Sequence, residues 1–127
     1  MLTVSHFLSI GIGAAVGAIC RWLLGLWLNH PSVALPWGTL AANLVGGYLI
    51  GVFLGMLSIY PEVPAWVRLM LVTGFLGGLT TFSTFSGETI GLLERGAYYS
   101  AMAYAAASLL GSLALTALGM ATVHALR

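Results

Sequence analysis

The sequence predicts an all-α integral membrane protein with four transmembrane helices, the third of them broken at mid-membrane. First, 60% of the residues are hydrophobic and only 6% are charged, whereas a soluble domain has about 25% charged residues. Second, four apolar segments are long enough to cross a bilayer, which takes roughly 20 residues each. Third, glycine and hydroxyl residues, which weaken helices, cluster at the centre of the third segment.

The composition also excludes several classes of protein. A formal net charge of +1 offers no basic surface for nucleic acid, and the apolar content is too high for a disordered chain. A chain of 127 residues has room for about four spans, so we expect one membrane domain over residues 1–127. The single cysteine, Cys20, lies in an apolar run and is expected to be a small buried hydrophobe.

The expected spans are bounded by helix-stop signals and aromatic residues. The first ends at Asn29-His30-Pro31, and prolines also flank the second. The first apolar run is too long for a signal peptide and is interpreted as a retained span. None of the segments alternates polar and apolar residues, so they are expected to be helices. The four spans run over residues 4–28, 37–59, 65–93 and 98–125.

The third span contains the least regular segment. Residues 74–87 hold four glycines and five hydroxyl residues, so the helix is expected to break at residues 77–81 and to restart near Phe82. A break inside a membrane is tolerated when it is buried in protein or lines a water-filled cavity, and broken helices recur at ion sites. The alternative is a glycine-rich packing surface that binds no ion.

The arginines give the chain almost no preferred orientation. Arg68 and Arg127 lie on one side of the expected topology, and Arg21 and Arg95 on the other. Because Lys/Arg asymmetry sets orientation, the chain is expected to insert both ways and to form an antiparallel, dual-topology homodimer. The alternative is that the weak bias still orients every copy in the same way.

Glycines at four-residue spacing predict close helix packing, within a compact bundle or in an oligomer. They occur at residues 13 and 17, at 47, 51 and 55, and at 87 and 91.

Polar side chains line up on single helix faces. They form a candidate track across the membrane, although Ser and Thr often bond their own helix backbone instead. The second span contributes Thr39 and Asn43, and the fourth contributes Tyr104, Ser108, Ser112 and Thr116. Phe82 and Phe85 share a face of the restarted half-helix.

This track offers hydroxyls, an amide and aromatic ring edges, which suit a small anion. Glu88 and Glu94 lie towards the end of the third span, whereas a proton-coupled cation exporter would want an acid at mid-membrane. Arg21 lies near one mouth, where it either draws anions in or reaches the headgroups. There is no catalytic set of residues, so an enzyme is not expected.

At this point the chain resembles the Fluc (CrcB-type) fluoride channel family over essentially its whole length. The most specific element is GGLTTFSTFSGE at residues 77–88, followed by GTLAAN at residues 38–43. GAICR at residues 17–21 and the pair Tyr104 and Ser108 also match.

The resemblance implies a fluoride-selective channel in the bacterial inner membrane that exports cytoplasmic fluoride passively and gives fluoride resistance. It also implies an antiparallel homodimer with a structural Na⁺ on its twofold axis, held by the backbone carbonyls of Gly77 and Thr80 from both subunits. Phe82 and Phe85 would form an aromatic box beside fluoride, and Asn43 would donate to the ion. The polar track would comprise Tyr104, Ser108, Ser112 and Thr116. Thr39 would belong to the pore at its mouth, and Arg21 and Glu88 to a vestibule or gate.

Two other functions remain open from the sequence. A small multidrug transporter also has four spans, although this chain lacks an acid in its first span. A membrane scaffold that pairs through its glycine faces would transport nothing.

Overall fold

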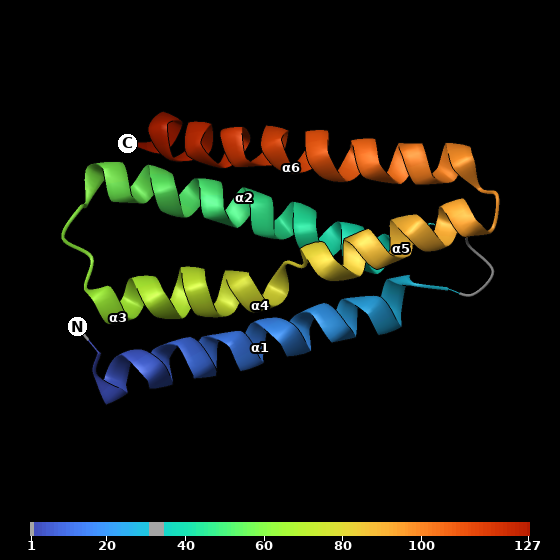
Figure 1. Ribbon diagram of the computed structural model, residues 1–127. Coiled ribbons are helices and arrows are strands. Elements are labelled where there is room, and N and C mark those ends of the chain that lie inside the picture. The colour runs from blue at the N-terminus through green and yellow to red at the C-terminus, as the bar shows by residue number, and fades with distance from the viewer. Residues whose placement is uncertain (1, 31–34) are drawn as a thin grey trace.

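Four long apolar helical spans make up the protein in the computed structural model, which describes residues 2–30 and 35–127 (Figure 1). Three of them are continuous: α1 (Val4–Leu28), α2 (Trp37–Ile59) and α6 (Tyr98–Leu126). The third span is assembled from α3 (Ala65–Arg68), η1 (Leu69–Leu76), α4 (Gly77–Leu79) and α5 (Phe82–Glu94). α1 ends at Leu28, and Pro31, the proline of the expected stop, lies outside the described residues.

The break in the third span is confirmed at Thr80 and Thr81. Both residues have extended backbones, with φ/ψ of −88°/154° and −151°/125°, and the chain visibly bends between α4 and α5 (Figure 1). Thr81 is the N-cap of α5, because its hydroxyl accepts the backbone N–H of Thr84 at 3.2 Å. A hydroxyl residue that can cap a helix therefore explains why α5 begins at Phe82.

The break moves the third span from one neighbour to another. Before it, η1 and α4 pack mainly on α1, whereas α5 packs mainly on α6. The most extensive helix pair is α2 with α6, and these two helices run side by side along most of their length (Figure 1). The two halves of the third span thus lie against different helices, and the bend between them faces α2.

Two of the three predicted glycine faces bring helix backbones together. A Cβ at Gly51 would collide with the carbonyl of Thr116 on α6, and one at Gly13 would collide with the carbonyl of Met70 on η1. The third face, at Gly87 and Gly91, meets no other helix among the described residues, so its alternative of packing between copies in an oligomer stays a prediction. Within residues 2–30 and 35–127, a Cβ at Gly87 would meet no atom within 4 Å, and the atom nearest to one at Gly91 belongs to the Arg95 side chain, at 3.9 Å. Both glycines instead border a cavity that Asn29 and Pro36, on either side of the α1–α2 connection, also line.

Large apolar side chains cover the outside of the bundle. Those with more than half of their area exposed include Phe7, Ile12, Trp22, Leu26, Ile90, Met102, Leu109 and Leu113. Such a surface belongs in lipid or against another apolar surface. Both termini lie at the same end of the bundle, as four spans require (Figure 1).

Candidate functional site

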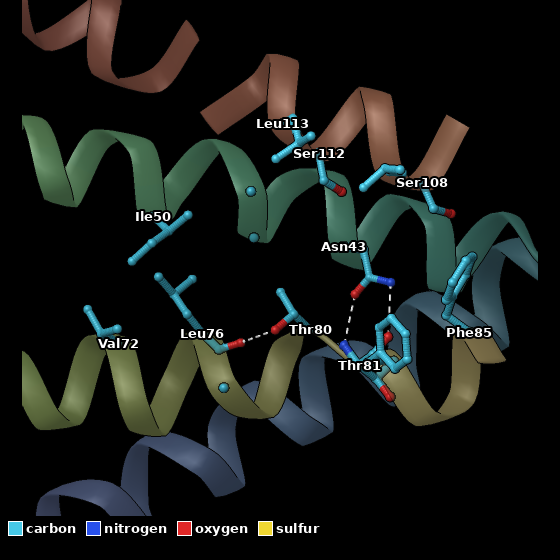
Figure 2. Close-up of a pocket in the computed structure, with 15 residues that line it drawn as sticks. Asn43, Ile50, Val72, Leu76, Thr80, Thr81, Phe85, Ser108, Ser112 and Leu113 are labelled. Carbon is cyan, nitrogen blue, oxygen red and sulfur yellow. Dashed lines mark hydrogen bonds between the residues drawn. The ribbon is translucent and has the colours of Figure 1, made fainter. Parts of the chain in front are cut away.

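The side chain of Asn43 on α2 is bonded to both backbone groups of Thr81 in the break. The Thr81 N–H donates to Oδ1 of Asn43 at 2.8 Å, and Nδ2 of Asn43 donates to the Thr81 carbonyl at 3.1 Å. Figure 2 shows the two bonds side by side. Only one orientation of the amide satisfies a donor and an acceptor of the same residue, so the pair fixes the position of its oxygen and nitrogen.

This pairing diverts backbone groups from the helical ladder. In a continuous helix the Thr81 N–H would bond the carbonyl of Gly77, but it bonds Asn43 instead. The N–H of Thr84 would bond the carbonyl of Thr80, but it goes to the Thr81 hydroxyl. Gly77 and Thr80 therefore lose their ladder partners, and the family resemblance implies that the carbonyls of these two residues hold a cation.

Arg21 lies at the break and not only at a mouth. Its Nε donates to the carbonyl of Gly78 at 3.1 Å, which joins α1 to the end of α4. A helix C-terminus carries partial negative charge, so a guanidinium there is electrostatically favourable. The positively charged side chain of Arg21 is thus held beside the break by a backbone oxygen.

A cavity of about 510 Å³ opens beside the break. Residues of α2, the third span and α6 line it (Figure 2), and its polar members are Asn43, Thr80, Thr81, Ser108 and Ser112. Ser108 is only 7% exposed, and among the residues that the structure describes its hydroxyl oxygen has no hydrogen-bond partner. A buried hydroxyl without a partner costs about 1–3 kcal/mol, so this donor is expected to bond a ligand or water.

The polar residues of α6 differ in what they contact. Ser112 lines the same cavity as Ser108. The hydroxyl of Thr116, by contrast, donates at 2.9 Å to carbonyls of Gly47 and Ser112, so it serves the α2–α6 contact. Thr116 therefore bonds helix backbone within this chain, which was the alternative to a place in the polar track.

The two phenylalanines of α5 both line this cavity, but they differ in burial. Their ring centroids are 5.7 Å apart, and Phe85 also lies 5.2 Å from the ring of Tyr104. Phe85 packs against a buried cluster that includes Leu40 and Tyr104, whereas Phe82 is 79% exposed. Only Phe85 is fixed by its own chain, and Phe82 presents an aromatic face to the outside of the bundle at the level of the break.

A hydrogen-bonded group surrounds Glu88, which lies three residues after Phe85 on α5. It also contains Thr39 of α2 and Tyr104 of α6. The hydroxyl of Tyr104 donates to Oε1 of Glu88 at 2.8 Å, and that of Thr39 donates to Oε2 at 3.1 Å. Tyr104 is 1% exposed and Thr39 is 5% exposed. Glu88 also lines a second cavity of about 350 Å³, together with His30 and Arg95.

The sequence pattern missed this group. Thr39 and Tyr104 were assigned to a mouth and a track separately, and Glu88 was placed only loosely. The spacings within single helices could not show that three helices bring these residues together. The one available signal was that a carboxylate and two hydroxyls each lie within a turn or two of another predicted site residue.

Comparison with known proteins identifies the family. The profile described as "CrcB-like protein, Camphor Resistance (CrcB)" matches residues 8–120. The chain belongs to this family.

Relatives of this CrcB-like chain are very similar along nearly their whole length. A Bordetella petrii protein named "Fluoride-specific ion channel FluC" is 68% identical over 96% of this chain and 94% of its own length. Proteins of the same name from Bordetella avium and Bordetella bronchiseptica are 64% and 63% identical, over 97% and 98% of their lengths. The relatives are named as channels, in agreement with the prediction that the chain is not an enzyme.

Proposed function

We propose that this protein is a fluoride-selective channel that lets fluoride leave a bacterial cell passively and so gives fluoride resistance. The observation that carries the proposal is the buried Ser108 hydroxyl, which has no partner in the described chain and borders the same cavity as Asn43 and Phe85. The names of the relatives supply the ion.

The chemistry of this cavity suits a small, strongly hydrated anion. Fluoride leaves water only where oriented donors replace its hydration shell. Ser108 and Ser112 supply hydroxyl donors, and the second N–H of the Asn43 amide is free of the Thr81 pairing. The ring of Phe85 adds an edge with partial positive charge. None of these groups is charged, so an anion is bound without being trapped.

The pathway that we propose continues from the first cavity to the second. Phe85 lines the first cavity and packs on Tyr104, Tyr104 bonds Glu88, and Glu88 lines the second cavity. Arg95 and His30 border that second cavity, and the arginine offers an anion a favourable potential there. Tyr104, Glu88 and Thr39 thus form the gate or vestibule between the two spaces.

We also propose that the working unit is an antiparallel, dual-topology homodimer embedded in lipid. The exposed ring of Phe82 and the open face at Gly87 lie on α5, next to the break. A second copy of opposite orientation would bring its own Phe82 to the same depth. The aromatic box would then take rings from both subunits, and the balanced arginines would permit this arrangement.

The break fits a structural Na⁺ at the dimer axis. Among the residues that the structure describes, no group of three or more His, Cys, Asp or Glu side chains could hold a metal. Backbone carbonyls are oxygen ligands that suit a hard cation, and those of Gly77 and Thr80 have lost their ladder partners. Bound Na⁺ supplies positive charge that offsets part of the cost of desolvating an anion.

A liposome experiment tests this function. Purified protein is reconstituted into vesicles loaded with potassium fluoride, valinomycin is added to carry the counter-charge, and a fluoride electrode records the release. We expect rapid release with the native chain and slower release with Ser108→Ala. Release at the rate of protein-free vesicles would reject the proposal.

The rival function is a small multidrug-type transporter. α1 carries no acidic residue in its described length, so it offers no proton-coupled site of that kind. Proton-driven uptake of a cationic dye into the same vesicles would favour the rival.

A further inference from the structure

We propose that Asn43 is a positioning residue that holds the third-span break open and so keeps the carbonyl of Gly77 free to bind a cation. This inference rests on the proposed channel function. It assigns to Asn43 a role toward the backbone, in addition to any contact with the transported anion.

The first support is that the Asn43 side chain bonds both backbone polar groups of Thr81. The side chain accepts from the Thr81 N–H at 2.8 Å and donates to the Thr81 carbonyl at 3.1 Å. Both distances are those of well-formed bonds. A planar amide that bonds both groups of one extended residue imitates the pairing of a neighbouring β-strand, so it favours the extended conformation of Thr81 over the helical one.

The second support is where the Thr81 N–H would otherwise go. A buried N–H needs an acceptor, and the acceptor in register is the carbonyl of Gly77, four residues earlier. Taking it would continue α4 by one residue and occupy the oxygen that the cation requires. The Asn43 side chain competes with the Gly77 carbonyl for the Thr81 N–H, and in the structure this N–H bonds Asn43.

The third support is steric and independent of the hydrogen bonds. Gly46 lies three residues after Asn43, so both occupy one face of α2. A Cβ at Gly46 would collide with Cγ2 of Thr80. The face of α2 that carries the Asn43 amide therefore also accommodates the break, because Thr80 packs against Gly46 on that face.

The test separates a positioning role from a contact with the anion. The full-length protein in detergent is unfolded thermally while Na⁺ replaces N-methyl-D-glucamine at constant ionic strength. A cation that binds only the folded state raises the melting temperature with a measurable midpoint. The variants are Asn43→Ala, Asn43→Asp and, as a matched control from the same cavity, Ser108→Ala.

We expect Asn43→Ala to raise the Na⁺ midpoint about tenfold, which corresponds to about 1.4 kcal/mol and to the size of one protein hydrogen bond. Asn43→Asp keeps an acceptor for the Thr81 N–H, so its midpoint should stay within about threefold of the native value, although an anionic side chain slows fluoride. Ser108→Ala should keep the native midpoint while fluoride release falls.

An unchanged midpoint in Asn43→Ala overturns the inference, and so does a native protein whose stability ignores Na⁺. If Asn43→Ala does not fold, Asn43→Asp decides, since loss of its Na⁺ response is incompatible with the positioning role. A native protein that responds to Na⁺ but releases no fluoride rejects the channel and leaves the positioning role standing.

Discussion

Tyr104 and Glu88 are joined by a 2.8 Å hydrogen bond between the α6 hydroxyl and Oε1 of the α5 carboxylate. The bond connects two helices that the break brings together, since α6 is the main neighbour of α5. Thr39 on α2 donates to the other carboxylate oxygen at 3.1 Å. One carboxylate thus links three of the four spans.

This link makes a prediction for stability. Tyr104→Phe leaves Oε1 of Glu88 without its donor in a group where Tyr104 is buried. A hydrogen bond to a charged acceptor contributes about 1.5–3 kcal/mol, so the melting temperature in detergent should fall measurably. Tyr98→Phe is the control, because Tyr98 is exposed at the start of α6. Equal melting temperatures for both variants would remove the link from the account.

The two phenylalanines should separate flux from folding. Phe82→Ile and Phe85→Ile are both expected to lower fluoride release while the dimer persists in size-exclusion chromatography. Only Phe85→Ile should lower the melting temperature, because Phe85 packs against Tyr104 whereas Phe82 is mostly exposed. Unchanged release rates in both variants would take the aromatic box out of the mechanism.

Close packing of α2 on α6 can be tested with two glycines. Gly51→Ala places a methyl group against the Thr116 backbone, and overpacking of this kind costs about 1–3 kcal/mol. Gly87→Ala adds the same methyl group where no described residue lies within 4 Å. Thermal unfolding should show a loss for the first variant only. If Gly87→Ala instead disrupts the dimer, that face is part of the subunit interface.

Dual insertion predicts labelling from both sides of the membrane. Glu62 is exposed between α2 and α3, so Glu62→Cys in a Cys20→Ser background gives a single reactive site. An impermeant maleimide should label part of the protein in intact cells and the rest only after permeabilisation. Labelling from one side alone would contradict the antiparallel dimer.

Much of the fold was predictable because its signals are local. Bilayer thickness sets the length of each apolar run, and the glycines and hydroxyls at residues 74–87 mark the break. Thr81 is a strong N-cap residue, so the restart at Phe82 follows from chemistry within four residues. The π-helical segment η1, Leu69–Leu76, was not predicted, since its residues resemble those of any apolar helix.

The candidate site was predictable in its residues and not in its pairings. Four-residue spacings aligned Asn43, Ser108 and Ser112 with a candidate polar track, and the structure has these three residues bordering one cavity. That Thr116 bonds backbone, and that Arg21 reaches the Gly78 carbonyl, depends on contacts between helices far apart in sequence. Such contacts depend on how the helices pack on one another, which no single span encodes.

The most direct measurement compares fluoride with chloride in the same reconstituted vesicles. An ion-selective electrode records the release of each halide after valinomycin is added, with protein-free vesicles as the baseline. The account predicts rapid release of fluoride and chloride release at the baseline, because uncharged donors in a narrow path replace the hydration of the smaller ion. Chloride released as fast as fluoride would contradict it.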